Sequence, residues 1–202
     1  GKNCEGDEKL RQMLTQAPKW GNDDDYVDSL AVEVVNLFFD EVDKHTCHRN
    51  PESPGPFTPG LHSLLFNVNL GLATAATPDG RKAGDLLSDG IAPFPGTHHG
   101  GPTTVFKSAA KLDHTRAYTA SLALTVNGPT EALADLFRTY LTDMGGLHLH
   151  VNILSPDILL DAKKNPGKYP DLLVRVAGLS ARFVELPEVL QDLVIRRVAL
   201  AL

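Results

Sequence analysis

The segment from Val174 to Phe183 contains a glycine, Gly178, that interrupts a strand-like pattern. Residues 174–178 are typical of a short strand, and a helical pattern begins only at Pro187. A glycine at such a break can take a positive φ angle, and it lets another backbone approach closely because it has no Cβ atom. The spacing alone therefore favours a backbone role for Gly178, since a motif this short is only a hypothesis about function.

The residues around Gly178 form a longer pattern that extends into the last helical segment. The pattern comprises Arg175, Val176, Ala177, Gly178, Ser180, Ala181, Phe183, Gln191, Asp192, Ile195 and Arg196. It closely resembles the signature of glycyl radical enzymes, the family of pyruvate formate-lyase and related dehydratases, decarboxylases, C–N and C–S lyases and arylsuccinate synthases. The resemblance implies that Gly178 is the catalytic residue, whose α-carbon loses a hydrogen atom and stores a radical.

This radical chemistry requires a glycine for a physical reason. An α-carbon radical is stabilised when it is planar and conjugated with the amide nitrogen on one side and the carbonyl on the other. A side chain would crowd that geometry and block the partner thiol, so the protein supplies position and protection from oxygen. The family usually has Tyr after the glycine, whereas this chain has Leu179. We expect that difference to affect packing more than chemistry.

Segments upstream of Gly178 carry the same resemblance. A tight turn is predicted at residues 76–84, because Pro78 fixes φ, the Asp79 side chain can bond the backbone and Gly80 accepts a positive φ. The stretch from Ala76 to Arg81 resembles the family a second time, and two independent matches in the right order are stronger than one. Further matching segments are 19–25, a turn before a long helix, and 89–96 and 101–112, a loop and a helix.

Strand and helix patterns alternate along the chain, which indicates an α/β fold. Strands are predicted at 61–74, 117–126, 147–154 and 172–177, and helices at 8–16, 27–45, 129–142, 157–165 and from 187 to the end. The resemblance implies the C-terminal part of a ten-stranded α/β barrel. Residues 1–82 would end the pyruvate formate-lyase-type barrel domain, and residues 83–202 would form the glycine radical domain.

Composition excludes several classes of function. The formal net charge of −6 gives no electrostatic footprint for nucleic acid or for an anionic membrane. No apolar run is long enough to span a bilayer, and the polar, turn-rich start does not look like a signal peptide. The two cysteines, Cys4 and Cys47, make a disulfide framework unexpected and suit a reducing cytoplasm.

Several polar clusters have alternative interpretations. A metal site at His45, Cys47 and His48 is disfavoured because no second ligand cluster follows, and a solvated loop is the better interpretation. Asn67 and Asn69 could face an active site or satisfy backbone groups, and the latter is favoured. His98 and His99 lie in a glycine-rich loop with no assigned role. His148, His150 and Asn152 lie on one face of a predicted strand, and the resemblance implies that this strand supports the glycine loop. Three cations, Lys107, Arg175 and Arg182, lie near the matching segments, and Arg175 could pair with a carboxylate.

The resemblance also implies how the radical is made and used. A radical S-adenosylmethionine activating enzyme with an iron–sulfur cluster installs it on Gly178, without a cofactor bound to this chain. The radical then oxidises an active-site cysteine, whose thiyl radical attacks a small-molecule substrate. Neither Cys4 nor Cys47 resembles that cysteine. The chemistry is anaerobic and oxygen-sensitive, the reaction is that of a lyase or acyltransferase, and a homodimer is possible.

Three interpretations of the chain remain open. It is the last portion of a full-length glycyl radical enzyme, a stand-alone radical-bearing subunit that complements a partner enzyme, or an inactive α/β scaffold module. Segment 101–104, together with Leu179 and Ser180, resembles the lyase, dehydratase and decarboxylase branch more than pyruvate formate-lyase itself.

Overall fold

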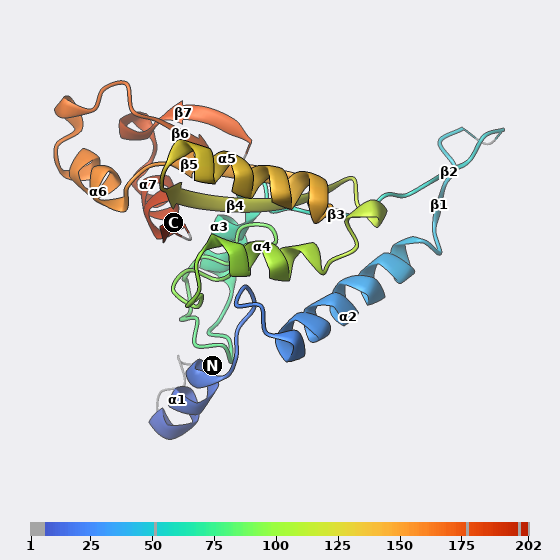
Figure 1. Ribbon diagram of the computed structural model, residues 1–202. Coiled ribbons are helices and arrows are strands. Elements are labelled where there is room, and N and C mark those ends of the chain that lie inside the picture. The colour runs from blue at the N-terminus through green and yellow to red at the C-terminus, as the bar shows by residue number, and fades with distance from the viewer. Residues whose placement is uncertain (1–6, 51, 177, 198, 202) are drawn as a thin grey trace.

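The centre of the computed structural model is a parallel sheet around one long strand (Figure 1). The structure describes residues 7–50, 52–176, 178–197 and 199–201. The long strand, β4 (Thr119–Asn127), pairs along one edge with β5 (His148–Ile153). Its other edge is shared by β3 (Gly60–Leu61) at the start and β8 (Ala199–Ala201) at the end. Both edges of β4 are paired, and its residues are buried along almost its whole length, as is typical of a parallel strand whose two faces are covered.

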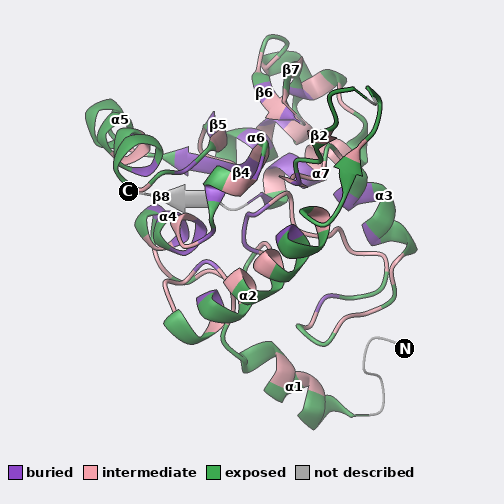
Figure 2. Cartoon of the chain, turned by 90° about the vertical axis from the view of Figure 1, so that its right-hand side faces the viewer, coloured by how far each residue is buried: buried purple, intermediate pink, exposed green. Residues whose placement is uncertain are grey.

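The two faces of this sheet differ in polarity. Alternate β4 residues on one face pack with α4 (Pro102–Ala110) and α5 (Thr130–Arg138) in the main apolar core. Figure 2 shows the buried stretches of β4 and α4 close together. The opposite face carries polar side chains from both strands. In the parallel register of β4 and β5, Ser121 lies beside His148 and Thr125 beside Asn152. This polar face lies next to the hairpin of residues 173–182 that carries Gly178, the candidate site.

A second, smaller core forms beside the sheet. It is built from α6 (Pro156–Lys164), α7 (Glu188–Arg196) and the antiparallel hairpin of β6 (Leu173–Val176) and β7 (Leu179–Arg182). A 3-10 turn (Phe183–Glu185) joins the hairpin to α7. The buried side chains of this core are Leu159, Ala162, Val174, Val176, Phe183 and Val194.

The remaining elements lie around these two cores. The helix α1 (Glu8–Gln16) buries no residue, and α2 (Asp25–Val42) runs toward the short hairpin of β1 (Thr46–Cys47) and β2 (Gly55–Pro56). The predicted helix at 129–142 is present, but its last turn is a π-helix (Thr139–Asp143) that buries Tyr140 against Phe106. Burial raises the pKa of Tyr140. Short 3-10 turns at His114–Arg116 and Pro166–Lys168 complete the described secondary structure.

The prediction of a strand over 61–74 is wrong. Only its first residue continues β3; Leu64 and Leu65 then have positive φ angles, and α3 (Phe66–Ala73) follows. A continuous apolar run of this length fits a buried strand and a short helix equally well, so periodicity could not decide. The two asparagines do not share a face: Asn67 is buried and donates to the carbonyl of Leu87 (3.4 Å), whereas Asn69 is exposed. The favoured interpretation, a backbone-satisfying amide, holds for Asn67.

The mixed α/β class is as predicted, whereas a ten-stranded barrel is not contained in the described residues. Within them, four strands form the parallel sheet, and the others form two separate hairpins. In the same part of the chain, no helix has the length and apolarity needed to cross a membrane.

An ion-pair cluster fastens α2 to α4. Asp28 is fully buried, and its Oδ2 accepts from Lys111 Nζ (2.7 Å) and from Ser108 Oγ (3.0 Å). Lys111 also contacts Asp23 (3.2 Å) and Asp25 (2.8 Å). Burial opposes the charged form of Lys111, but the three carboxylates outweigh it, and the pKa of Lys111 is raised. Asp28 therefore depends on Lys111 for its charge balance.

We expect Lys111→Met to lower the free energy of unfolding by about 3 kcal/mol, because it leaves a buried carboxylate without its cation. The matched control is Lys107→Met. In the described part of the chain Lys107 pairs with Asp23 alone (3.0 Å) and its side chain is half exposed, so its loss should cost less than about 1 kcal/mol. Urea denaturation of both variants measures the difference. Equal losses would contradict the proposed dependence of Asp28 on Lys111.

Candidate functional site at Gly178

Gly178 lies at the tip of the β6–β7 hairpin. The hairpin is closed by the pair Val176–Leu179, so the turn consists of two residues, of which Ala177 lies outside the described residues. Gly178 has φ +79°, a left-handed backbone conformation that glycine adopts without steric cost. The positive φ is confirmed, and the helix predicted from Pro187 is present as α7, whereas the strand between the glycine and that helix was not predicted. A second strand follows the glycine, because β7 returns along β6 before α7 begins.

The space around Gly178 is limited by one side chain. A Cβ atom placed on Gly178 would lie 3.8 Å from both Cε1 and Nε2 of His150, an ordinary van der Waals contact. Among the described residues, no other backbone approaches this position closely. The backbone conformation, rather than crowding, is the structural reason for a glycine here.

Hydrogen bonds to the backbone of one hairpin residue, Arg175, anchor the hairpin to the polar face of the sheet. Asn152 Oδ1 accepts from the backbone N–H of Arg175 (2.6 Å), and Asn152 Nδ2 donates to the Arg175 carbonyl (3.4 Å). The same carbonyl accepts from Arg197 Nη1 (2.7 Å). The expectation that the strand with His150 and Asn152 supports the glycine loop is thus confirmed.

Two histidines lie side by side beneath the hairpin tip. The rings of His148 and His150 meet edge to face, with centroids 4.3 Å apart. Nδ1 of His148 lies 3.1 Å from Thr119 Oγ1, and Nδ1 of His150 lies 3.3 Å from Ser121 Oγ. Burial lowers the pKa of His150, and the neighbouring His148 lowers it further. The imidazole next to Gly178 is therefore neutral at neutral pH.

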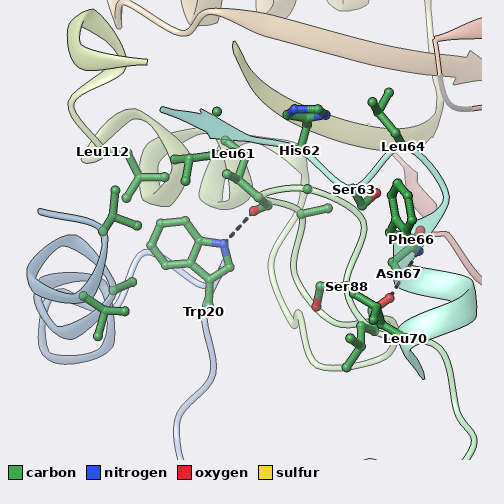
Figure 3. A pocket seen from close by; sticks show the side chains of 18 of the residues that line it. Trp20, Leu61, His62, Ser63, Leu64, Phe66, Asn67, Leu70, Ser88 and Leu112 are labelled. Atoms are coloured by element: carbon green, nitrogen blue, oxygen red, sulfur yellow. Dashed lines mark hydrogen bonds between the residues drawn. The ribbon is translucent and has the colours of Figure 1, made fainter. Parts of the chain in front are cut away.

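A cavity of about 260 Å³ borders His150. Its lining includes Ser63, Asp89 and Tyr118 together with both histidines. Within the described residues, no group of three His, Cys, Asp or Glu side chains could hold a metal ion. A larger apolar groove of about 870 Å³ lies between α2 and the β3–α3 segment, and it shares His62, Ser63 and Leu64 with the lining of the cavity (Figure 3). Trp20 closes one side of it and donates to the carbonyl of Ile91 (2.8 Å).

Of the other candidate residues, His98, His99 and Cys47 lie outside the hairpin, whereas Arg175 belongs to β6. The backbone N–H of His99 donates to Asn22 Oδ1 (2.6 Å), which ties the loop of His98 and His99 to the segment after α1. Cys47 lies in β1, and Cys4 is outside the described residues. The guanidinium of Arg175 donates to Ser180 Oγ across the hairpin (3.3 Å), and no carboxylate is among its described partners.

Three residues of the site were not anticipated from the sequence: Ser63, Asp89 and Arg197. Arg197 Nη2 donates to Asp89 Oδ2 (2.9 Å), and Ser63 Oγ donates to Asp89 Oδ1 (2.5 Å). The three belong to distant parts of the chain. Asp89 begins the segment 89–96 that carries the family resemblance, and Arg197 is a cation that directly follows the last predicted helical face, but nothing in the sequence indicated that the two meet.

Comparison with known proteins identifies the family. The model described as "Glycine radical" matches residues 87–184, and the model described as "Pyruvate formate lyase-like" matches residues 2–71. The probable dehydratase YbiW of Escherichia coli is 42% identical over 94% of this chain, and the formate acetyltransferase of Haemophilus influenzae is 37% identical over 89%. The solved structure of the B12-independent glycerol dehydratase from Clostridium butyricum, with glycerol bound, is 40% identical over 99% of the chain, with a TM-score of 0.88.

This chain spans about a quarter of the length of these relatives, namely 25% of each curated protein and 26% of the solved structure. Its hairpin glycine, Gly178, falls inside the segment that the glycine radical model matches. Since both family models, the curated relatives and the solved structure agree, the chain belongs to the pyruvate formate-lyase-like family of glycyl radical enzymes.

Proposed function

We propose that Gly178 stores the radical of a pyruvate formate-lyase-like enzyme and passes it to an active-site cysteine outside these 202 residues. The observation that carries the proposal is the position of Gly178 at the tip of an anchored hairpin, within the segment matched by the glycine radical model. Its φ of +79° and the open side toward His150 suit a residue that must remain a glycine.

The proposed reaction moves one hydrogen atom at a time. A radical S-adenosylmethionine activating enzyme removes a hydrogen atom from the α-carbon of Gly178 and leaves the radical there. The cysteine thiol then gives its hydrogen atom to Gly178 and becomes a thiyl radical, which abstracts a hydrogen atom from a small-molecule substrate. The part of this chain is to hold the α-carbon in place and to keep solvent and oxygen away from it.

The chain contributes to this task through the polar face of the sheet. Asn152 fixes the peptide groups of Arg175, three residues before the radical position, and His150 covers one side of the Gly178 α-carbon. A neutral imidazole is suited to that position, because it places no charge beside a carbon-centred radical.

The wider assignment follows the same proposal. Residues 1–82 end a ten-stranded barrel domain and residues 83–202 form the glycine radical domain; the separate matches at 2–71 and 87–184 support this division. The identity with a probable dehydratase and a glycerol dehydratase supports the lyase, dehydratase and decarboxylase branch. The protein works in the cytoplasm, takes a small-molecule substrate and forms a homodimer.

A stand-alone radical-bearing subunit is the second candidate. Cys47 lies in β1, and the described residues that line the cavity beside His150 include no cysteine. Such a chain would lend its radical to a partner enzyme that supplies the thiol. The inactive scaffold module is the remaining alternative, and it requires that Gly178 never carries a radical.

Anaerobic electron paramagnetic resonance tests the proposal. The protein is incubated with a cognate activating enzyme and S-adenosylmethionine, once as the 202-residue chain and once with any upstream sequence of its reading frame. We expect a carbon-centred doublet. A signal from the chain alone favours the stand-alone subunit, and a signal only with upstream sequence favours the full-length enzyme. No signal in either form, with the activating enzyme competent on another substrate, would leave the scaffold module.

A further inference from the structure

Arg197 is a buried cation at the end of α7. Only 4% of the residue is exposed, and its guanidinium connects two distant segments. Nη1 donates to the carbonyl of Arg175 in the glycine hairpin (2.7 Å), and Nη2 donates to Asp89 Oδ2 (2.9 Å). A buried charge is costly unless it is paired and hydrogen-bonded, so this arrangement depends on Asp89.

Asp89 is held in place by the central sheet. Ser63 Oγ donates to its second carboxylate oxygen (2.5 Å). The next residue, Gly90, bridges to Leu122 of β4 and has φ +62°, and a Cβ atom there would lie 2.1 Å from the carbonyl oxygen of Ser121. The backbone N–H of Ile91 donates to that same oxygen (2.9 Å). The position of Asp89 is therefore determined by β4.

Groups on both edges of β4 bond to the same hairpin residue, Arg175. Asn152 reaches Arg175 from β5, along one edge, and the Asp89–Arg197 pair reaches it from the other edge. Val174 and Val176 of the hairpin pack in the smaller core, whereas Leu173 is 61% exposed and Leu179 is 72% exposed. The hydrogen bonds to Arg175, whose side chain lies on the other face of β6 from these two valines, connect the hairpin to the sheet and position its tip over His150.

We propose that Asp89 and Arg197 are positioning residues that hold Gly178 against the polar face of the sheet, above His150. The bond from Arg197 to the Arg175 carbonyl is charge-assisted and therefore about twice as strong as a neutral one. Removing the negative charge of Asp89 leaves the buried guanidinium unpaired and weakens its bond to the hairpin. We call the Asp89–Arg197 pair and its bond to Arg175 the clamp. Its effect on the radical rests on the proposed function, whereas its effect on the position of the hairpin does not.

Hydrogen exchange in the full-length protein tests the clamp. Asp89→Asn removes the charge at nearly constant shape, and Arg197→Gln removes the guanidinium. In each variant we expect amide exchange in residues 173–182 to accelerate about tenfold while exchange in β4 stays unchanged. The double variant should exchange no faster than the single ones, because both remove the same interaction.

The matched control is Asp171→Asn, which removes the exposed partner of Arg182 near the open end of the same hairpin (3.4 Å). It should leave exchange in the hairpin unchanged. Ser63→Ala is a milder variant that removes only one bond to Asp89, and it serves if Arg197→Gln fails to fold. We expect a smaller acceleration in residues 173–182 from it. Unchanged exchange in the folded Asp89 and Ser63 variants, or equal acceleration in the hairpin and β4, would overturn the proposal.

A second measurement connects the clamp to the radical. In activated protein under argon, the electron paramagnetic resonance signal should decay several-fold faster in Asp89→Asn than in the parent and in Asp171→Asn. Faster decay with faster hairpin exchange supports a positioning role, and unaltered decay overturns it. If the parent forms no radical while the hairpin loosens as expected, the proposed function fails and the clamp stands.

Discussion

Gly178→Ala is expected to abolish the radical and to leave the fold of the hairpin almost unchanged. The added methyl group would lie 3.8 Å from the His150 ring, so it fits without displacing another atom. The φ of +79° costs an alanine about 1 kcal/mol, too little to unfold the hairpin. The methyl group occupies the side of the α-carbon that faces His150, and it crowds the planar arrangement that stabilises the radical.

Gly84→Ala separates the radical effect from backbone strain. Gly84 has φ +81°, and a Cβ atom there would meet nothing within 4 Å, so the variant carries a similar strain at a position without chemistry. Spin counting by electron paramagnetic resonance should give the parent value for Gly84→Ala and no signal for Gly178→Ala. Urea denaturation should give similar stabilities for the two variants. An undiminished radical in Gly178→Ala would end the assignment.

The parts of the site that were predictable from the sequence are local. The pattern around Gly178 predicts its radical role, which stays a prediction, and the alternation of His148, His150 and Asn152 placed them on one strand face. Each signal lies within one continuous stretch of the chain, residues 175–196 and 148–152. The first two helices were likewise predictable, because caps and apolar spacing determine them locally, as with the Asp24 side chain at the start of α2.

The parts that could not be predicted depend on contacts between distant segments. Asp89 and Arg197 form an ion pair although they are 108 positions apart in the chain, and no neighbouring residue in the sequence indicates that they pair. The strand β7 alternates too weakly to stand out, and it forms because β6 offers a paired edge. The three-residue strand β8 is likewise defined by β4. In each case the tertiary partner decides, and local propensity does not.

Exposure of the activated protein to air is expected to cut the chain at Gly178. Molecular oxygen adds to a carbon-centred radical, and the resulting peroxyl group leads to scission of the backbone at that carbon. The proposed site protects Gly178 only partly, because the residue is not fully buried and Leu179 beside it is 72% exposed. Scission should therefore be complete in activated chains and absent in chains that were never activated.

The structure also predicts how the cut protein will behave. The piece that begins near Leu179 keeps the β7 pairing with β6 and contributes Phe183 and Val194 to the smaller core. It should therefore remain bound after scission and separate only on denaturation. Denaturing mass spectrometry should show two fragments, while native mass spectrometry should show one particle of nearly unchanged mass. An intact chain under denaturing conditions, after air exposure of a sample with a verified radical, would count against Gly178 as the radical position.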